Sequence, residues 1–324
     1  MIHSRDLPMD LASCRLPATR TLLTNININR SDPSHIRQGI VYVVIGLSIA
    51  SFGGAVMKLL ASDLTSIQIA WFRFTGYALI MLPVVFFRFG RAMLKPARPG
   101  IQAIRGISLA TAALTFVIGV KTVDFADAIA ILYAYPFLLM LIAVSFLGER
   151  VHWVGWFGVV GGFIGVLLVM RPGFSQVNIG TLSVFASAII VSVQMALNRK
   201  LGAVSPPLVT SLWGALIAAI LLSCLLPFNW QPVSLELWWL LALLIVCGAV
   251  SQTLVVIAFS KANASSLAPF TYFEIIAAVI IGFTMFGTLP GWISWLGMLL
   301  IVSSGLIVAK SLPGRHIPQR NPKI

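Results

Sequence analysis

Ten apolar stretches, each long enough to cross a lipid bilayer, constrain what this chain can fold into. A helix of about 20 apolar residues spans a hydrocarbon core about 30 Å thick. Only 10% of the 324 residues are charged, whereas a soluble domain carries about 25%. We therefore predict an all-α, polytopic membrane protein with ten transmembrane helices that contact the lipid bilayer. The stretches run over approximately residues 38–61, 66–87, 101–121, 125–147, 152–171, 180–198, 206–227, 237–259, 263–287 and 291–310.

The Lys and Arg residues are unevenly divided between the two sides of such a bundle. With the N-terminus inside, 17 of the 22 lie on the inner side, 2 lie outside, and Lys58, Arg73 and Arg105 fall within the stretches. Because cytoplasmic loops collect Lys and Arg, we expect both termini in the cytoplasm. The same rule explains the net charge of +13, so no nucleic acid is expected as a partner.

The two halves of the chain are related by an internal repeat. At an offset of 139 residues, Gly148 aligns with Gly287, Trp153 with Trp292, and Gly158 with Gly297. Five helices per half is an odd number, so the second half must enter the membrane upside down. We expect four parts: a basic cytoplasmic tail (1–37), two inverted five-helix repeats (38–171 and 172–310), and a second cytoplasmic tail (311–324). Inverted repeats are typical of secondary transporters, which bind substrate between the halves.

The motifs of enzymes and cofactor sites are missing from the sequence. It contains no GxxxxGK[ST] phosphate loop and no HExxH zinc motif. The three cysteines have no metal or redox spacing, and no Ser/His or paired-Asp arrangement falls within the spans. We therefore expect no catalytic residue, no metal and no cofactor, and a protein that is not an enzyme. Monomer and homodimer both stay open.

Four charged residues inside the predicted spans are candidates for function, since a charge at mid-bilayer costs about 2.5–3.5 kcal/mol. We predict that Arg73 and Arg105 bind a carboxylate or phosphate of the substrate. Glu274, near the middle of the ninth span, is predicted to bind substrate and the coupling ion, and Asp127 is a second ion-coupling candidate. Two structural alternatives stay open: an Arg73–Glu274 ion pair, and an Arg105 that reaches toward the lipid headgroups.

Tyrosines mark the middle of the fourth and ninth spans. Pro136 follows Tyr135 in mid-span, where it removes a backbone donor and frees the carbonyl of Leu132. Transporters tend to place a binding site at such a helix break. We expect Tyr133, Tyr135 and Tyr272 to form an aromatic wall of the substrate cavity. The alternative is a packing kink that binds nothing.

Several short motifs together resemble the EamA-type, ten-helix members of the drug/metabolite transporter superfamily. The resemblance covers approximately residues 38–310. Within the superfamily, the chain is similar to the bacterial branch of carriers for S-adenosylmethionine and other metabolites. It implies residence in the bacterial inner membrane. The matching motifs are Arg105-Gly106, Ala126-Asp127-Ala128, Tyr135-Pro136, Leu147-Gly148-Glu149-Arg150, Gly162-Phe163-Ile164-Gly165-Val166, Arg171-Pro172-Gly173, Ala268-Pro269-Phe270-Thr271-Tyr272 and Gly305.

The function expected from these features is secondary active transport by alternating access. The substrate would be a small organic metabolite that is amino-acid-like, nucleoside-like or vitamin-like. An efflux pump for drugs or metabolites with the same fold is the main alternative. A channel or a non-transporting membrane scaffold is a further one.

Overall fold

The computed structural model describes residues 33–91, 95–147, 153–170, 179–202, 204–262 and 264–311. Within them, the regular elements are α-helices and short 3-10 helices, so the predicted all-α class is confirmed. Residues 1–32 of the first predicted tail (1–37) and residues 312–324 of the second (311–324) lie outside the described residues, whereas residues 33–37 belong to the first helix and Ser311 ends the last one. Two parts of the quoted motifs, Gly148–Arg150 and Arg171–Gly173, also lie outside the described residues.

The first repeat contributes five apolar segments, the fourth of which is broken in two. Its helices are α1 (Pro33–Leu60), α2 (Ser66–Phe89), α3 (Pro99–Val120), α4 (Phe125–Leu132), α5 (Tyr135–Leu147) and α6 (Trp153–Met170). The predicted and observed bounds agree within a few residues, and α1 begins five residues earlier than the first apolar stretch, at Pro33.

The second repeat follows the same plan. Its helices are α7 (Ile179–Gly202), α8 (Pro207–Leu225), α9 (Trp238–Lys261), α10 (Ala264–Thr271), α11 (Phe273–Phe286) and α12 (Trp292–Ser311), with two 3-10 turns, η2 (Leu226–Phe228) and η3 (Leu235–Leu237), between α8 and α9. Among the described residues, nine segments are long and apolar enough to cross a membrane, and α12 adds a shorter apolar helix.

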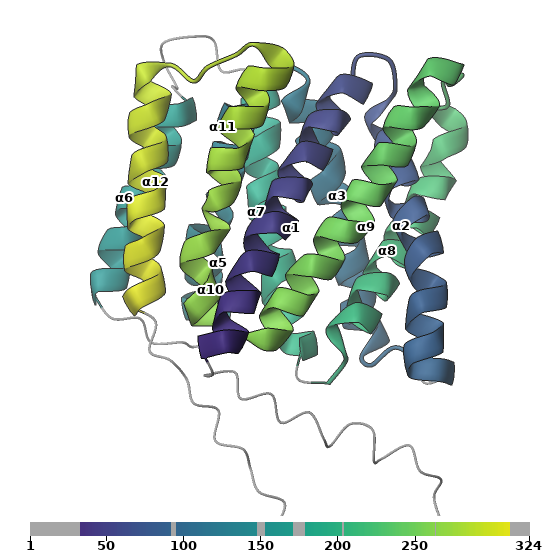
Figure 1. The fold of residues 1–324 in the computed structure, drawn as a ribbon, viewed down its shortest axis with the longest axis horizontal. Helices are drawn as coiled ribbons and strands as arrows, with labels where there is room; N and C mark the ends of the chain where they lie inside the picture. The colour runs from purple at the N-terminus through teal and green to yellow at the C-terminus, as the bar shows by residue number, and fades with distance from the viewer. Residues whose placement is uncertain are drawn as a thin grey trace, which may run out of the picture.

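The two broken segments cross the bundle in opposite directions, as inverted repeats require. Figure 1 shows that α1 begins and α12 ends on one face, here called the terminal face. Lys261, beside the start of α10, donates a hydrogen bond of 2.8 Å to Gln38 at the start of α1. Lys58, at the far end of α1, donates a bond of 2.5 Å to the Val123 carbonyl just before α4. The α4/α5 segment therefore starts at the face opposite to the one where α10/α11 starts.

Contacts between the repeats, rather than within them, hold the bundle together. The most extensive helix contacts join α1 to α9, α6 to α12, α3 to α7 and α2 to α8. The outer surface is apolar: Phe87 and Phe157 are 86% and 68% exposed, as suits side chains that face lipid. The centre of the molecule thus lies at the interface between the repeats, where transporters bind substrate.

The glycine pattern of the fifth span packs two helices of the same protomer together. A Cβ atom on Gly165 would meet the Gly297 carbonyl of α12, and a Cβ on Gly297 would meet the Gly165 carbonyl of α6. Gly158 faces the backbone of Ser304 in the same way. Small residues let two helix backbones approach closely, so this stripe serves the fold within one chain.

Candidate substrate site

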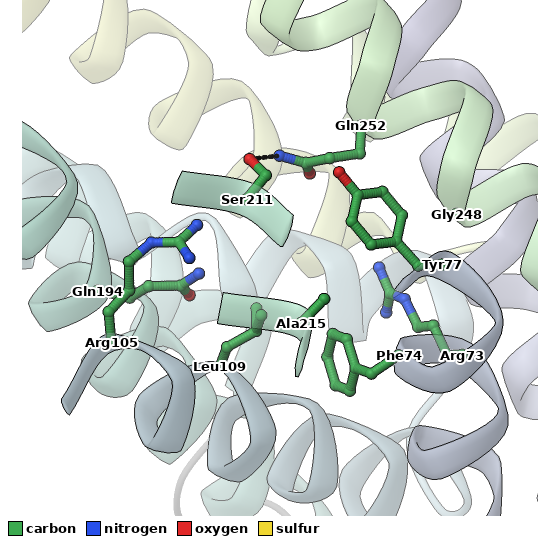
Figure 2. A pocket seen from close by; sticks show the side chains of 10 residues that line it. All are labelled: Arg73, Phe74, Tyr77, Arg105, Leu109, Gln194, Ser211, Ala215, Gly248 and Gln252. Atoms are coloured by element: carbon green, nitrogen blue, oxygen red, sulfur yellow. Dashed lines mark hydrogen bonds between the residues drawn. The ribbon is translucent and has the colours of Figure 1, made fainter. Parts of the chain in front are cut away.

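A central cavity lies between the repeats, with walls from α1, α2, α3, α4, α7, α8, α9 and α11. It consists of two adjoining pockets of about 450 and 680 Å³, which share four lining residues. The first pocket is lined by Arg73, Phe74, Tyr77, Arg105, Leu109, Gln194, Ser211, Ala215, Gly248 and Gln252 (Figure 2). The second shares Arg73, Phe74, Leu109 and Gln194 with it and reaches Met57 on α1 and Glu274 on α11.

Arg105 stands at one end of this cavity and ties three helices together. Its Nη1 donates a hydrogen bond of 2.8 Å to the Thr210 carbonyl of α8, and its Nε donates to Asn198 Oδ1 of α7. The side chain is 4% exposed. Gly214, one turn beyond Thr210, leaves room for the guanidinium, because a Cβ atom there would overlap Nη1. Arg105 thus links α3 to α7 and α8 by hydrogen bonds inside the protein. That it binds substrate stays a prediction.

Arg73 lies across the cavity from Arg105 and has a different environment. Its Nη1 lies 3.3 Å from the Met57 sulfur, and its guanidinium carbon lies 5.8 Å from the Phe74 ring centre. Among the described residues, no ion pair joins Arg73 to an acid; Glu274 interacts with it only across the cavity. A thioether is a weak acceptor for a cation. The Arg73 guanidinium therefore faces the cavity (Figure 2) without an ion pair among the described residues.

Glu274 enters the second pocket from the break between α10 and α11. At Tyr272 the helix is interrupted, and the Ile275 N–H donates to the Tyr272 carbonyl at 3.1 Å. In an unbroken helix that N–H would bond to the carbonyl of residue 271, four positions earlier. The Thr271 carbonyl is instead 2.5 Å from Tyr133 Oη, which also lies 2.8 Å from Glu274 Oε2.

The first repeat is broken at the corresponding place. Helix α4 ends at Leu132 and α5 begins at Tyr135, directly before Pro136. The Phe137 N–H donates to the Ala134 carbonyl at 3.1 Å rather than to residue 133. The mid-span break expected from Pro136 is therefore present. At the offset of 139, the break at Tyr133 coincides with the break at Tyr272.

The three predicted tyrosines meet where the two breaks cross. The ring centres of Tyr133 and Tyr272 lie 5.4 Å apart, and those of Tyr133 and Tyr135 lie 5.7 Å apart. Tyr133 is 1% exposed, and none of the three lines either of the two pockets described above. In this structure they support the wall behind Glu274 rather than form its surface.

Asp127 and Lys58 lie away from the cavity, toward the face opposite the terminal face. Asp127 Oδ2 accepts a hydrogen bond of 3.2 Å from Ser294 on α12. The Lys58 ammonium, besides its bond to Val123, lies 5.3 Å from the Phe286 ring centre. Asp127 does not line the two pockets that hold Arg73 and Glu274, so an ion-coupling role for Asp127 stays a prediction.

Four polar residues of the cavity were not among the predicted site residues: Tyr77, Gln194, Ser211 and Gln252. Tyr77 follows Arg73 by four positions, which places both on one face of α2, and that spacing is a signal in the sequence. Gln194 lines both pockets from α7. Gln252 donates a hydrogen bond of 3.4 Å to Ser211 across α9 and α8, as expected for an amide inside a helical bundle.

Comparison with known proteins agrees with this architecture. The chain is similar to the S-adenosylmethionine uptake transporter of Rickettsia prowazekii (26% identity, 87% of this chain, 97% of the relative). It is similar to the riboflavin transporter of Rhizobium johnstonii (26%, 86% and 93%) and to the pseudopaline exporter CntI of Pseudomonas aeruginosa (21%, 86% and 98%). One solved crystal structure matches its fold with a TM-score of 0.60 at 18% identity, over 85% of this chain and 96% of that chain.

The family model extends over both halves of the molecule. It matches residues 37–171 and again residues 178–309, which include the helices that line the cavity. The protein is thus a multi-pass membrane protein of a bacterial family of small-metabolite transporters. The chain belongs to the EamA-like transporter family.

Proposed function

We propose that the protein is a secondary active transporter that carries a small organic metabolite across the bacterial inner membrane by alternating access. The observation that supports this most is Arg73, a cation in a central cavity with no acid paired to it among the described residues. A buried charge is costly unless it is paired. A substrate that carries a carboxylate or phosphate would supply the missing partner, as amino-acid-like, nucleoside-like or vitamin-like metabolites can.

The transport experiment uses purified protein in proteoliposomes with radiolabelled S-adenosylmethionine, which carries a carboxylate, and riboflavin, which carries neither a carboxylate nor a phosphate; these are the compounds named for two relatives. A thermal-shift screen of metabolites broadens the search. A carrier should give saturable uptake that is accelerated when the vesicles are preloaded with unlabelled substrate. Flux that neither saturates nor shows counterflow would indicate a channel. A protein that neither binds nor moves any compound in the screen would be a scaffold.

Export is the second candidate direction, because one similar protein is named as an exporter. The orientation of the chain in the membrane is a separate question. The excess of Lys and Arg on the terminal face supports cytoplasmic termini. Reporter fusions after Arg37 and at Ile324 should both read inside, and an external signal at either end would contradict this orientation.

Glu274 is the proposed coupling group, since it lines the cavity together with Arg73. A carboxyl group in this position can bind and release a proton once in each transport cycle. Glu274→Gln mimics the protonated acid, so exchange of substrate for substrate should persist while net uptake loses its pH dependence. Both are measured in proteoliposomes over a range of pH. Unchanged pH dependence would leave Glu274 a structural role.

A further inference from the structure

The hydroxyl of Tyr133 faces two acceptors with a single hydrogen atom. Its oxygen lies 2.5 Å from the Thr271 carbonyl oxygen and 2.8 Å from Glu274 Oε2. A phenol can donate only one hydrogen bond. Both short contacts can be hydrogen bonds at once only if Glu274 is protonated, with its O–H donating to Tyr133 and the Tyr133 O–H donating to Thr271.

The Thr271 carbonyl relies on the Tyr133 hydroxyl because it receives no hydrogen bond from the Ile275 N–H. The break at Tyr272 diverts the Ile275 N–H to the Tyr272 carbonyl, so the usual intrahelical donor is lost. An unsatisfied buried carbonyl costs about 1–3 kcal/mol. A side chain of the first repeat thus stabilises the broken helix of the second.

Loss of the proton from Glu274 would change this arrangement. The proton leaves to water in the cavity, and the carboxylate becomes a pure acceptor. Hydrogen bonds to a charged acceptor are roughly twice as strong as neutral ones. The single Tyr133 hydrogen then turns to Glu274, and the Thr271 carbonyl loses its donor.

We propose that Tyr133 is a positioning residue that couples the protonation of Glu274 to the conformation of the break between α10 and α11. This rests on the proposed function only in taking Glu274 as the proton-coupling group. Transport by alternating access needs such a link between a bound ion and a helix that can move. Tyr133 provides it across the interface of the two repeats.

The other titratable groups around Glu274 do not take part in this exchange of hydrogen bonds. Arg73 on α2 lines the same pocket as Glu274, and the rings of Tyr135 and Tyr272 lie beside the Tyr133 ring in tilted orientations. Lys58 on α1 lies near Phe286, twelve residues or about 18 Å along the helix from Glu274. Asp127 on α4 bonds to Ser294.

Hydrogen–deuterium exchange of the full-length protein in nanodiscs tests the proposal without any substrate. The readout is the peptide over residues 268–276, corrected for the intrinsic pH dependence of amide exchange. In the wild type, this peptide should exchange about fivefold to tenfold faster once Glu274 ionises, the effect of losing one hydrogen bond. Glu274→Gln should hold it at the slow rate at every pH. Tyr133→Phe should hold it at the fast rate at every pH.

Tyr135→Phe is the matched control, because it removes a neighbouring hydroxyl and leaves the Tyr133 bonds in place. It should keep the wild-type pH dependence. The proposal is overturned if Tyr133→Phe exchanges like the wild type, or if Glu274→Gln retains the pH dependence. Because the readout needs no transport, failure here leaves the proposed function standing. A protein that passes this test but moves no metabolite would instead contradict the proposed function.

Discussion

Two arginines line the same cavity, yet their surroundings differ and predict different roles for them. Arg105 donates to Asn198 and to the Thr210 carbonyl and fits against Gly214. Arg73 has a sulfur atom and an aromatic ring beside it, and no acid paired to it among the described residues. A satisfied cation stabilises the fold, whereas an unsatisfied one is ready for a ligand. If Arg73 binds the substrate, its replacement should weaken transport more than it weakens the fold.

Replacement of Arg105 should have the largest effect of the variants proposed, and this effect should be a loss of folding stability. Arg105→Met removes both donors and leaves Asn198 and the Thr210 carbonyl without them. Each buried group left unsatisfied costs about 1–3 kcal/mol. We expect a clear drop in the thermal unfolding temperature of the purified protein and less protein in the membrane. An Arg105→Met variant as stable as the wild type would contradict the expectation that Arg105, unlike Arg73, stabilises the fold.

Replacement of Arg73 should act on transport and spare the fold. Arg73→Ala removes the charge that would meet the substrate's anionic group, and a hydrogen bond to a charged group contributes about 1.5–3 kcal/mol. Uptake at low substrate concentration should therefore fall about tenfold to one hundredfold, measured in proteoliposomes that contain equal amounts of protein. The unfolding temperature should stay constant or rise. Arg73→Lys keeps the charge and should retain part of the activity.

Loss of the Arg73→Ala protein from the membrane would mean that Arg73 is structural after all. A double neutralisation with Glu274→Gln would then identify the partner, since it should restore folding only if the two residues stabilise each other as an ion pair.

Gly214→Ala is a milder test of the hydrogen bonds that Arg105 makes with α7 and α8. The added methyl group would overlap the guanidinium, which must shift away from the Thr210 carbonyl. Overpacking of this kind typically costs about 1–3 kcal/mol, so the unfolding temperature should fall by less than in Arg105→Met. Gly202→Ala on α7 is the control, because a Cβ atom there meets nothing within 4 Å. Equal stability of the two variants would contradict the claim that Gly214 makes room for the hydrogen-bonded Arg105 side chain.

The sequence predicts the positions of the helices well because the bilayer dictates their length. The second apolar stretch, predicted at 66–87, corresponds to α2 at Ser66–Phe89. The break before α5 was predictable as well, since Pro136 removes a backbone donor in mid-span. The break at Tyr272 was not, because Ile275 stands where the first repeat has Pro136. The side chain that satisfies that break, Tyr133, comes from the other repeat.

The roles of the two arginines could not be separated from the sequence. Each is a lone cation in an apolar run, and the sequence predicts only that each faces the interior. The partners of Arg105 include a backbone carbonyl, which carries no residue-type signal. Gly214, which makes room for it, lies on a different helix and far along the chain.

The most direct test of the account compares two ligands on two proteins. Equilibrium binding is measured for the transported metabolite and for its analogue without the anionic group, on the wild type and on Arg73→Ala. The account predicts that Arg73→Ala weakens binding of the intact metabolite at least about tenfold, the effect of losing a charge-assisted bond, and leaves the analogue's affinity unchanged. Equal weakening for both ligands, or none for either, would contradict the claim that Arg73 holds the substrate's negative charge.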